Sequence, residues 1–124
     1  MLGPRCKVLS GSWVSAYDGL RTDKPGDLDV DHVVPLENAY ISGGDTWSTD
    51  RRTQYANDQA DLWVVSAGSN RSKGARSPDQ WRPPERAVWC TYARRWVAIK
   101  VRWDLTATTS ERDALGQMLD TCPA

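Results

Sequence analysis

Apolar side chains recur at helical spacing in the last third of the chain. One series runs through residues 85–103 and a second through residues 110–120, with apolar positions three or four residues apart. The first series is Val88, Tyr92, Trp96, Ile99 and Trp103, and the second is Ala114, Leu115, Met118 and Leu119. A turn-forming stretch at residues 104–109 separates them. The pattern predicts a C-terminal hairpin of two helices over about residues 85–122.

Alternation of apolar and polar positions predicts a strand earlier in the chain. Residues 28–32, LDVDH, alternate over their whole length, as is typical of a strand with one buried face. We expect this strand to bury Leu28 and Val30 and to present Asp29 and Asp31 on one exposed face. The two carboxylates would then point the same way.

The other predicted elements are short. They are extended pieces at residues 7–10 and 12–14 with a turn at 18–19, helices at 37–42 and 50–56, a strand at 62–65 and a helix at 67–74. Ser48 or Thr49 can cap the second of these helices and Ser66 the third, while Pro78 is placed to begin a further helix after Ser77. Short strands with separate helices predict an α+β fold, with a small hairpin core and additional helices.

Length and composition limit the class of protein. The chain of 124 residues is sized for a single domain, 1–124. Hydrophobic residues make up 40% and charged residues 26%, which excludes a disordered chain of low hydrophobicity. No apolar run reaches the ~20 residues of a bilayer span, so we expect no membrane partner. Seven Trp and four Tyr, with no Phe, predict a core of large rings that each carry a polar group.

The cellular location stays open at this level. Residues 1–5 lack the apolar core of a secretion signal. The chain is therefore cytoplasmic if Met1 is the native start, or secreted if it is trimmed from a longer precursor.

The charges cancel overall but are segregated along the chain. Sixteen basic and sixteen acidic residues give a net charge of zero, which argues against binding of nucleic acid through bulk charge. Residues 18–50 carry eight acids and two bases, whereas residues 71–102 carry nine bases and two acids. An acidic segment beside a cationic one suits a metal site that acts on a polyanion, although charged segments are also common on ordinary solvated faces.

Two of the three cysteines are placed to meet. Cys90 and Cys122 lie symmetrically about position 106, inside the predicted turn, and residues equidistant from such a bend face each other. A disulfide is one outcome and two buried thiols are the other, since disulfides are rare in reducing compartments. Cys6 is left over, and with a single His the chain shows no zinc-ligand spacing.

His32 is the only histidine, and histidine is the side chain that ordinarily exchanges protons near neutral pH. Asp31 precedes it, and the segment SNRSKG, residues 69–74, follows the next predicted strand. Carboxylate and amide oxygens from these segments are hard ligands that suit Mg²⁺ or Mn²⁺. The sequence therefore places a candidate base beside candidate metal ligands.

The segment DVDHVVPL, residues 29–36, together with SNRSKG resembles the HNH, or ββα-metal, nuclease family. More narrowly, it resembles the C-terminal HNH domain of GmrSD-type modification-dependent restriction enzymes and the related small actinobacterial HNH proteins. The HNH domain of RNA-guided CRISPR effectors is similar through the same two segments. The ββα-metal motif covers about residues 28–81, and a segment from Cys90 to Lys100 extends the likeness to the actinobacterial proteins.

The resemblance implies a role for individual residues. It assigns Asp31 and Asn70 as ligands of one divalent metal, Mg²⁺ or Mn²⁺, and His32 as the general base that activates a water. Lys73, inside the matched motif, and the neighbouring residues Arg71 and Arg76 are expected to hold backbone phosphates. The implied reaction is hydrolysis of a phosphodiester in nucleic acid, with DNA preferred over RNA as the partner.

One catalytic position departs from the family. Asp61 stands where the family usually has an Asn that orders the loop around the base. A carboxylate accepts a hydrogen bond but donates none unless it is protonated, so this role is half preserved, and Asn57 is a nearby substitute. A weak or inactive HNH-like domain that binds nucleic acid or docks a partner therefore remains an alternative. A disulfide-stapled extracellular protein without a nucleic-acid role is the third reading.

Overall fold

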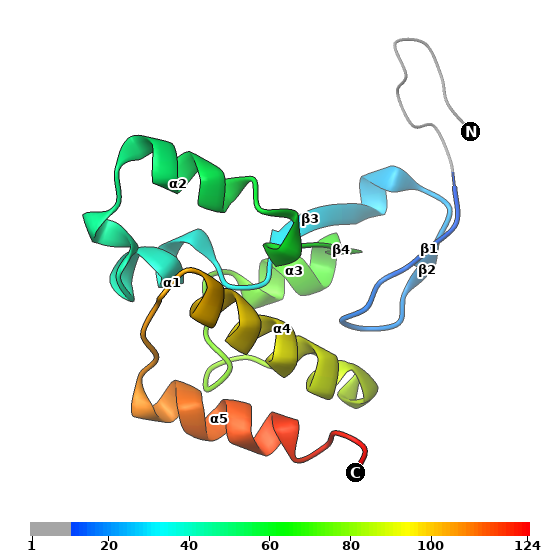
Figure 1. Ribbon diagram of the computed structural model, residues 1–124. Helices are drawn as coiled ribbons and strands as arrows, with labels where there is room; N and C mark the ends of the chain where they lie inside the picture. Colours follow the sequence, from blue (N-terminus) through cyan, green and yellow to red (C-terminus); the bar gives the residue numbers. More distant parts are fainter. Residues whose placement is uncertain (1–10) are drawn as a thin grey trace.

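The computed structural model describes residues 11–124, so Cys6 and the extended piece predicted at residues 7–10 lie outside the described part. Within it, two small antiparallel sheets are combined with five α-helices (Figure 1). This is the α+β fold that the sequence predicts.

A ββα unit forms the centre of the fold. β3 (Leu28–His32) pairs along its whole length with β4 (Leu62–Ser66) in an antiparallel register. α3 (Ala67–Lys73) follows directly, and the Ser66 hydroxyl caps it by accepting a hydrogen bond from the Ser69 N–H. The predicted strands and the predicted cap are confirmed, and α3 packs against both strands.

A second hairpin lies beside this unit. β1 (Trp13–Val14) and β2 (Arg21–Thr22) pair around a turn in which Gly19 has a φ of 74°, a conformation that favours glycine. The Ser66 N–H donates to Ser15 Oγ at 2.9 Å, which ties the hairpin to β4.

Two helices are inserted between β3 and β4. They are α1 (Leu36–Ile41) and α2 (Thr49–Ala56), and both confirm the predicted helices. Ser48 caps α2, since its hydroxyl accepts from the Arg51 N–H. A short 3-10 helix, Gln59–Asp61, then leads the chain into β4.

The C-terminal part is the predicted helical hairpin. α4 (Trp89–Arg102) packs against α5 (Thr109–Leu119) (Figure 1). A disulfide joins Cys90 to Cys122. The predicted pairing of these two cysteines is confirmed. No helix within residues 11–124 combines the length and apolar character needed to cross a bilayer.

The helix expected after Pro78 is absent from the described structure. The N–H groups of Gln80 and Trp81 both donate to the Ser77 carbonyl, so this stretch forms a tight turn. Pro83 follows shortly afterwards and has no N–H to continue a helical ladder, which explains why the turn does not extend.

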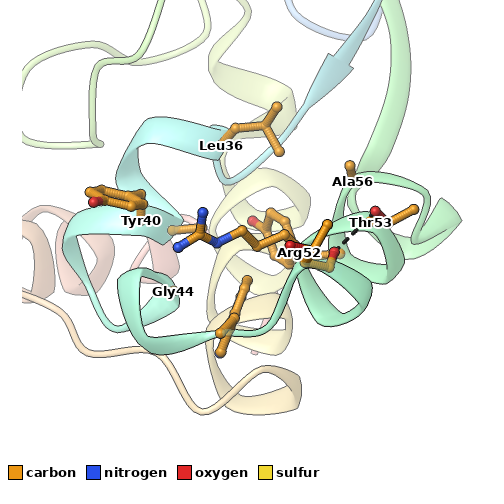
Figure 2. Close-up of a pocket in the computed structure, with 10 residues that line it drawn as sticks. Leu36, Tyr40, Gly44, Arg52, Thr53 and Ala56 are labelled. Atoms are coloured by element: carbon orange, nitrogen blue, oxygen red, sulfur yellow. Dashed lines mark hydrogen bonds between the residues drawn. The ribbon is translucent and has the colours of Figure 1, made fainter.

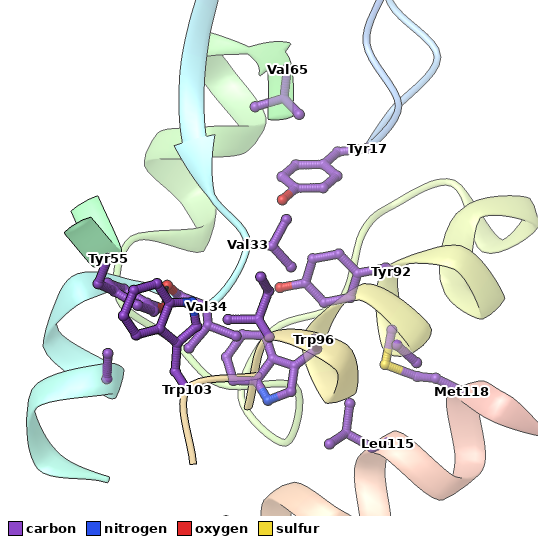
Figure 3. Packing of buried hydrophobic residues seen from close by; sticks show 13 residues of the cluster. Tyr17, Val33, Val34, Tyr55, Val65, Tyr92, Trp96, Trp103, Leu115 and Met118 are labelled. Carbon is purple, nitrogen blue, oxygen red and sulfur yellow. Dashed lines mark hydrogen bonds between the residues drawn. The ribbon is translucent and has the colours of Figure 1, made fainter. Parts of the chain in front are cut away.

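The core is built from aromatic rings. Tyr17, Tyr92 and Trp96 are fully buried (Figure 3). The Tyr17 ring meets those of Trp63 and Tyr92 edge-on, with centroids 5.6 and 5.5 Å away, a favourable geometry for aromatic pairs. Trp96 Nε1 donates to the buried Glu111 carboxylate at 3.2 Å. The expectation of a core of large rings is confirmed, while the buried Tyr92 hydroxyl has no hydrogen-bond partner among the described residues.

The buried face of β3 is the opposite of the one expected. Val30 is 61% exposed, whereas Asp31 is only 7% exposed. An ion pair from Lys73 and a hydrogen bond from Tyr17 compensate the burial of the Asp31 carboxylate. The alternation correctly placed Asp29 and Asp31 on one face, but the side that it assigned to the interior was wrong.

Candidate functional site

His32 ends β3 with its imidazole held by one backbone oxygen. Its Nε2 lies 2.9 Å from the carbonyl oxygen of Ala56, the last residue of α2. A carbonyl oxygen only accepts hydrogen bonds, so Nε2 carries a proton and the neutral ring has its lone pair on Nδ1. The side chain is half-buried. This arrangement presents an oriented imidazole that can take a proton through Nδ1.

Asn70 lies beside Asp29. Asn70 is on α3, and its Nδ2 donates to Asp29 Oδ2 at 2.9 Å. Asp29 and Asp31 occupy alternate positions of β3 and therefore share the face that α3 covers. The structure brings Asn70 to this acidic face, as expected, but its direct partner is Asp29.

Asp31 is buried and has two partners. The Tyr17 hydroxyl donates to Asp31 Oδ2 at 2.6 Å, and Lys73 Nζ lies 2.9 Å from the same oxygen. Burial raises the pKa of Tyr17, and the neighbouring Asp31 charge acts in the same direction. Both described contacts use Oδ2, so Oδ1 is the Asp31 oxygen left to meet a cation.

We expected Lys73 to be exposed and to hold a backbone phosphate, but the structure places it in the interior. Its side chain is fully buried, and its amine also donates to the carbonyl oxygen of His32 at 2.9 Å. Burial lowers the pKa of Lys73, while the Asp31 carboxylate opposes that change. Lys73 therefore connects Asp31 to the backbone of His32 from inside the fold, and its ammonium is not displayed to a phosphate backbone.

Asp61 holds the turn after His32. Its backbone oxygen accepts from the Val33 N–H at 2.7 Å, and its Oδ1 accepts from the Val34 N–H at 2.8 Å. The residue is fully buried, and its Oδ2 has no hydrogen-bond partner among the described residues. Burial raises the pKa of Asp61 to about 6, against the opposing effects of the Val34 hydrogen bond and the charge of Lys73.

The two arginines of the matched segment are on the surface. Arg71 and Arg76 are exposed, and Arg76 Nη1 donates to the Ser72 carbonyl at 2.6 Å. Within residues 11–124, neither arginine forms an ion pair. Their guanidinium groups are available to bind an anion.

The acidic face of β3 has the chemistry of a hard-cation site. Within the described part of the chain, no group of three or more His, Cys, Asp or Glu side chains is arranged to hold a metal ion. Asp29, Asp31 and Asn70 instead offer two carboxylates and one amide oxygen. Mg²⁺ is usually held by one or two carboxylates and keeps several waters, so this donor set fits it.

Three parts of the site were missed by sequence reasoning. The period of β3 places Asp29 with Asp31, which was a usable signal for Asp29. Tyr17 reaches Asp31 from fourteen positions earlier, and the Ala56 carbonyl reaches His32 from twenty-four positions later. No local pattern encodes such contacts, because they depend on how the elements pack.

Comparison with known proteins gives the family. The model of the family "GmrSD restriction endonucleases, C-terminal domain" matches residues 4–118. An uncharacterized secreted protein of Arthroderma benhamiae is 44% identical over 119 residues, which cover 94% of this chain. The aligned part is 58% of that relative, so the chain spans less than two thirds of its length. No solved structure matches the chain significantly. The chain belongs to the family of C-terminal domains of GmrSD restriction endonucleases, an HNH-type endonuclease family.

Proposed function

We propose that this chain is a metal-dependent endonuclease that hydrolyses phosphodiester bonds in DNA, with His32 as the general base. The observation that carries this proposal is the 2.9 Å hydrogen bond from His32 Nε2 to the Ala56 carbonyl. It fixes the tautomer in which Nδ1 is free to accept a proton, which is what a general base requires. Membership of a restriction-endonuclease family supports a phosphodiester as the bond attacked.

The residues around His32 orient it. His32 Nδ1 would remove a proton from the water that attacks the phosphorus atom, in line with the leaving oxygen. Lys73 Nζ holds the His32 carbonyl, and Asp61 holds the N–H groups of the next two residues. These two residues position the base and do not touch substrate.

Asp31 and Asn70 would hold a divalent cation, with Asp29 beside them on the same face. When bound, Mg²⁺ or Mn²⁺ stabilises negative charge on the phosphate and on the leaving oxygen. Asp31 directly precedes His32, so their side chains leave opposite faces of β3, and they would meet one phosphate at the end of the strand, where His32 is the last residue.

A second candidate function is a catalytically inactive domain that binds nucleic acid or docks a partner. The observation that favours it is the ion pair of 2.9 Å between Asp31 and Lys73, because a carboxylate already paired with an ammonium attracts a cation less strongly. Cleavage assays separate the two functions.

The test of the proposed function is cleavage of plasmid DNA by His32→Ala in the presence of Mg²⁺, Mn²⁺ or Zn²⁺ and of a chelator. We expect the wild type to cut only with metal and the variant to be slower by about 10²-fold or more. Added imidazole is expected to restore part of the rate. Gln54→Ala, an exposed position of α2, is the matched control and should keep full activity. Wild-type turnover by His32→Ala would contradict the assignment.

Metal binding is tested separately by calorimetry with Mn²⁺. Asp31→Asn and Asn70→Ala each remove an oxygen donor from a site with few protein ligands, so each is expected to weaken binding. Asp50→Asn, an exposed acid of α2, is the control and should bind as the wild type does. Equal affinity for Mn²⁺ in the wild type and in the Asp31→Asn/Asn70→Ala double variant would show that the cation does not bind at this position.

We also propose that the protein works in an oxidising compartment. The disulfide between Cys90 and Cys122 and the similarity to a protein described as secreted both support this location. Thiol counting on the protein as purified from its natural source, under denaturing conditions, is expected to find these two cysteines oxidised. Two additional free thiols would favour a reducing compartment.

A further inference from the structure

A cavity of about 370 Å³ lies between α1 and α2 (Figure 2). That volume falls within the ~300–1,000 Å³ typical of small-ligand pockets. Ala56 lines the cavity and also accepts the hydrogen bond from His32, while Leu36, another lining residue, begins α1 four positions after His32. The cavity therefore shares a wall with the candidate active site.

The walls of this cavity are apolar and aromatic. Leu36 and Tyr40 lie four positions apart on α1, and they are 49% and 53% exposed. Residues spaced by four share one face of a helix, so both side chains belong to a single open wall. Trp47 lines the cavity as well. Exposed aromatic surface in a concave site is a feature of ligand pockets.

The rim of the cavity supplies a cation. Arg52 of α2 is exposed, and its guanidinium carbon lies 5.6 Å from the centre of the Tyr40 ring (Figure 2). Its Nη2 donates to the Asp45 carbonyl at 3.1 Å. An arginine held against an aromatic ring can stack with flat groups and bind phosphate. An apolar pocket with one planar cation at its rim matches a flat heteroaromatic group that is attached to a phosphate.

We propose that this cavity binds one unstacked nucleobase of the strand that is cleaved, with the base against Tyr40 and a flanking phosphate at Arg52. This inference rests on the proposed nuclease function. In a duplex, a base is paired and stacked, and extruding it costs a few kcal/mol, so the pocket favours an unpaired nucleotide. The substrate class that follows is single-stranded nucleic acid, or a duplex with an unpaired position next to the cleaved bond.

The lining of the cavity favours contact with the base over contact with the backbone. Arg52 is the charged residue among those that line it, and none of the lining residues is acidic. One arginine can meet one phosphate, whereas the apolar and aromatic remainder of the wall can pack only against a base. Binding here should therefore depend mainly on stacking, which is worth ~1–3 kcal/mol per base, or about 5- to 160-fold in affinity.

The test is binding in chelator, without catalysis, of a fluorescent oligo-dT of about 12 nucleotides and of a fully abasic strand of equal length. We expect the wild type to bind oligo-dT at least about 5-fold more tightly than the abasic strand. Tyr40→Ala and the pocket-filling variant Thr53→Trp should lose that preference, and the matched control Tyr40→Phe should keep it. Melting temperatures confirm that each variant is folded.

The role of Arg52 has its own readout. Arg52→Gln should reduce the salt dependence of oligo-dT binding, with a log–log slope smaller by about 0.7, the value for one phosphate contact on a single strand. Arg112→Gln, an exposed arginine on α5, is the control and should leave the slope unchanged.

Two results would overturn the proposal. One is equal binding of oligo-dT and the abasic strand by the wild type. The other is a preference for oligo-dT that Tyr40→Ala leaves unchanged, as expected for a pocket that takes a protein side chain or a second copy. Because the assay contains chelator, failure of the nuclease proposal appears separately, as base-dependent binding without cleavage when metal is added.

Discussion

Lys73 is a fully buried lysine, and its amine lies 2.9 Å from an Asp31 oxygen. Removing one partner of such a pair leaves the other charge buried and uncompensated, which typically costs ~3–5 kcal/mol. We expect Lys73→Met to lower the free energy of unfolding by this amount, measured by urea denaturation. Arg71→Met, at an exposed position of the same helix, should change it by less than about 0.5 kcal/mol.

The double variant Asp31→Asn/Lys73→Met adds an independent check of this pair. Neither charge remains in it, so part of the stability lost by Lys73→Met alone should return. Equal losses in Lys73→Met and in the Arg71→Met control would show that the buried pair does not account for the effect.

Asp61 gives the protein a specific dependence of stability on pH. Burial raises its pKa from 3.8 to about 6, so between these values the folded state keeps a proton that the unfolded state loses. The contribution of Asp61 to the free energy of unfolding is therefore fully present below about pH 4 and is lost as the pH rises through about 6. The loss is on the order of 2 to 3 kcal/mol.

Asp61→Asn tests this dependence. The amide oxygen can still accept the Val34 N–H, and the side chain carries no charge to bury. We expect the variant to be more stable than the wild type at pH 7.5 and nearly equal to it at pH 4, as measured by urea midpoints. A difference that stays constant between the two pH values would mean that Asp61 does not titrate in this range.

At the scale of single elements, local patterns predicted most of the fold. The alternation in residues 28–32 gave β3, and Ser48 and Ser66 marked the starts of α2 and α3 through their capping hydroxyls. These features are local, because a strand period or an N-cap involves residues only a few positions apart. The same locality explains the error after Pro78, where a turn satisfied the backbone instead of a helix.

The geometry of the candidate site could not be predicted from local patterns, because it depends on contacts between residues far apart in the sequence. The alternation in β3 indicates which residues share a face of the strand. It does not indicate which face is buried, because that depends on distant residues. Lys73 contacts the backbone of His32 from forty-one positions away, and Tyr17 contacts Asp31 from fourteen positions away. A motif placed Asn70 near the acidic strand, yet its hydrogen bond to Asp29 depends on how α3 sits across β3. The sequence could therefore name candidate groups for the site and could not give the contact partners of each group.

At the scale of elements, we predict that the disulfide stabilises the fold, because it covalently links the two ends of the α4–α5 hairpin. It joins residues 32 positions apart, and closing a loop of that length stabilises the folded state by about 3 to 4 kcal/mol in the chain-entropy account. The Cys90→Ala/Cys122→Ala variant should lose about this much in urea denaturation, and reductant should destabilise the wild type equally. Cys6 alone remains in this variant, so reductant should not change its stability, and a variant as stable as the oxidised wild type would contradict the prediction.

Across the whole molecule, the cationic segment is less exposed than its count suggests. Two of its nine bases are buried in ion pairs, Lys73 with Asp31 and Lys100 with Glu111. The remaining bases are all arginines, and several of them pack on rings, as Arg95 does over Trp63 at 4.4 Å. A charge count from sequence therefore overestimates the positive surface, since it cannot separate buried lysines from free arginines. Long-range attraction of DNA should be weak in a molecule of zero net charge.

The last prediction concerns the contacts by which this molecule binds duplex DNA. Arg71 and Arg76 are exposed and unpaired within the described residues, so they are the cations of the matched segment that can reach backbone phosphates. We expect Arg71→Gln and Arg76→Gln each to weaken binding similarly across sequences and to lower the log–log salt slope by about 0.9, the value for one phosphate contact. Measurement is by fluorescence anisotropy over a range of salt with chelator present, and Arg112→Gln on α5 is the control. An affinity for DNA that does not change with salt concentration would show that these arginines do not bind backbone phosphates. It would favour the inactive docking domain over the nuclease.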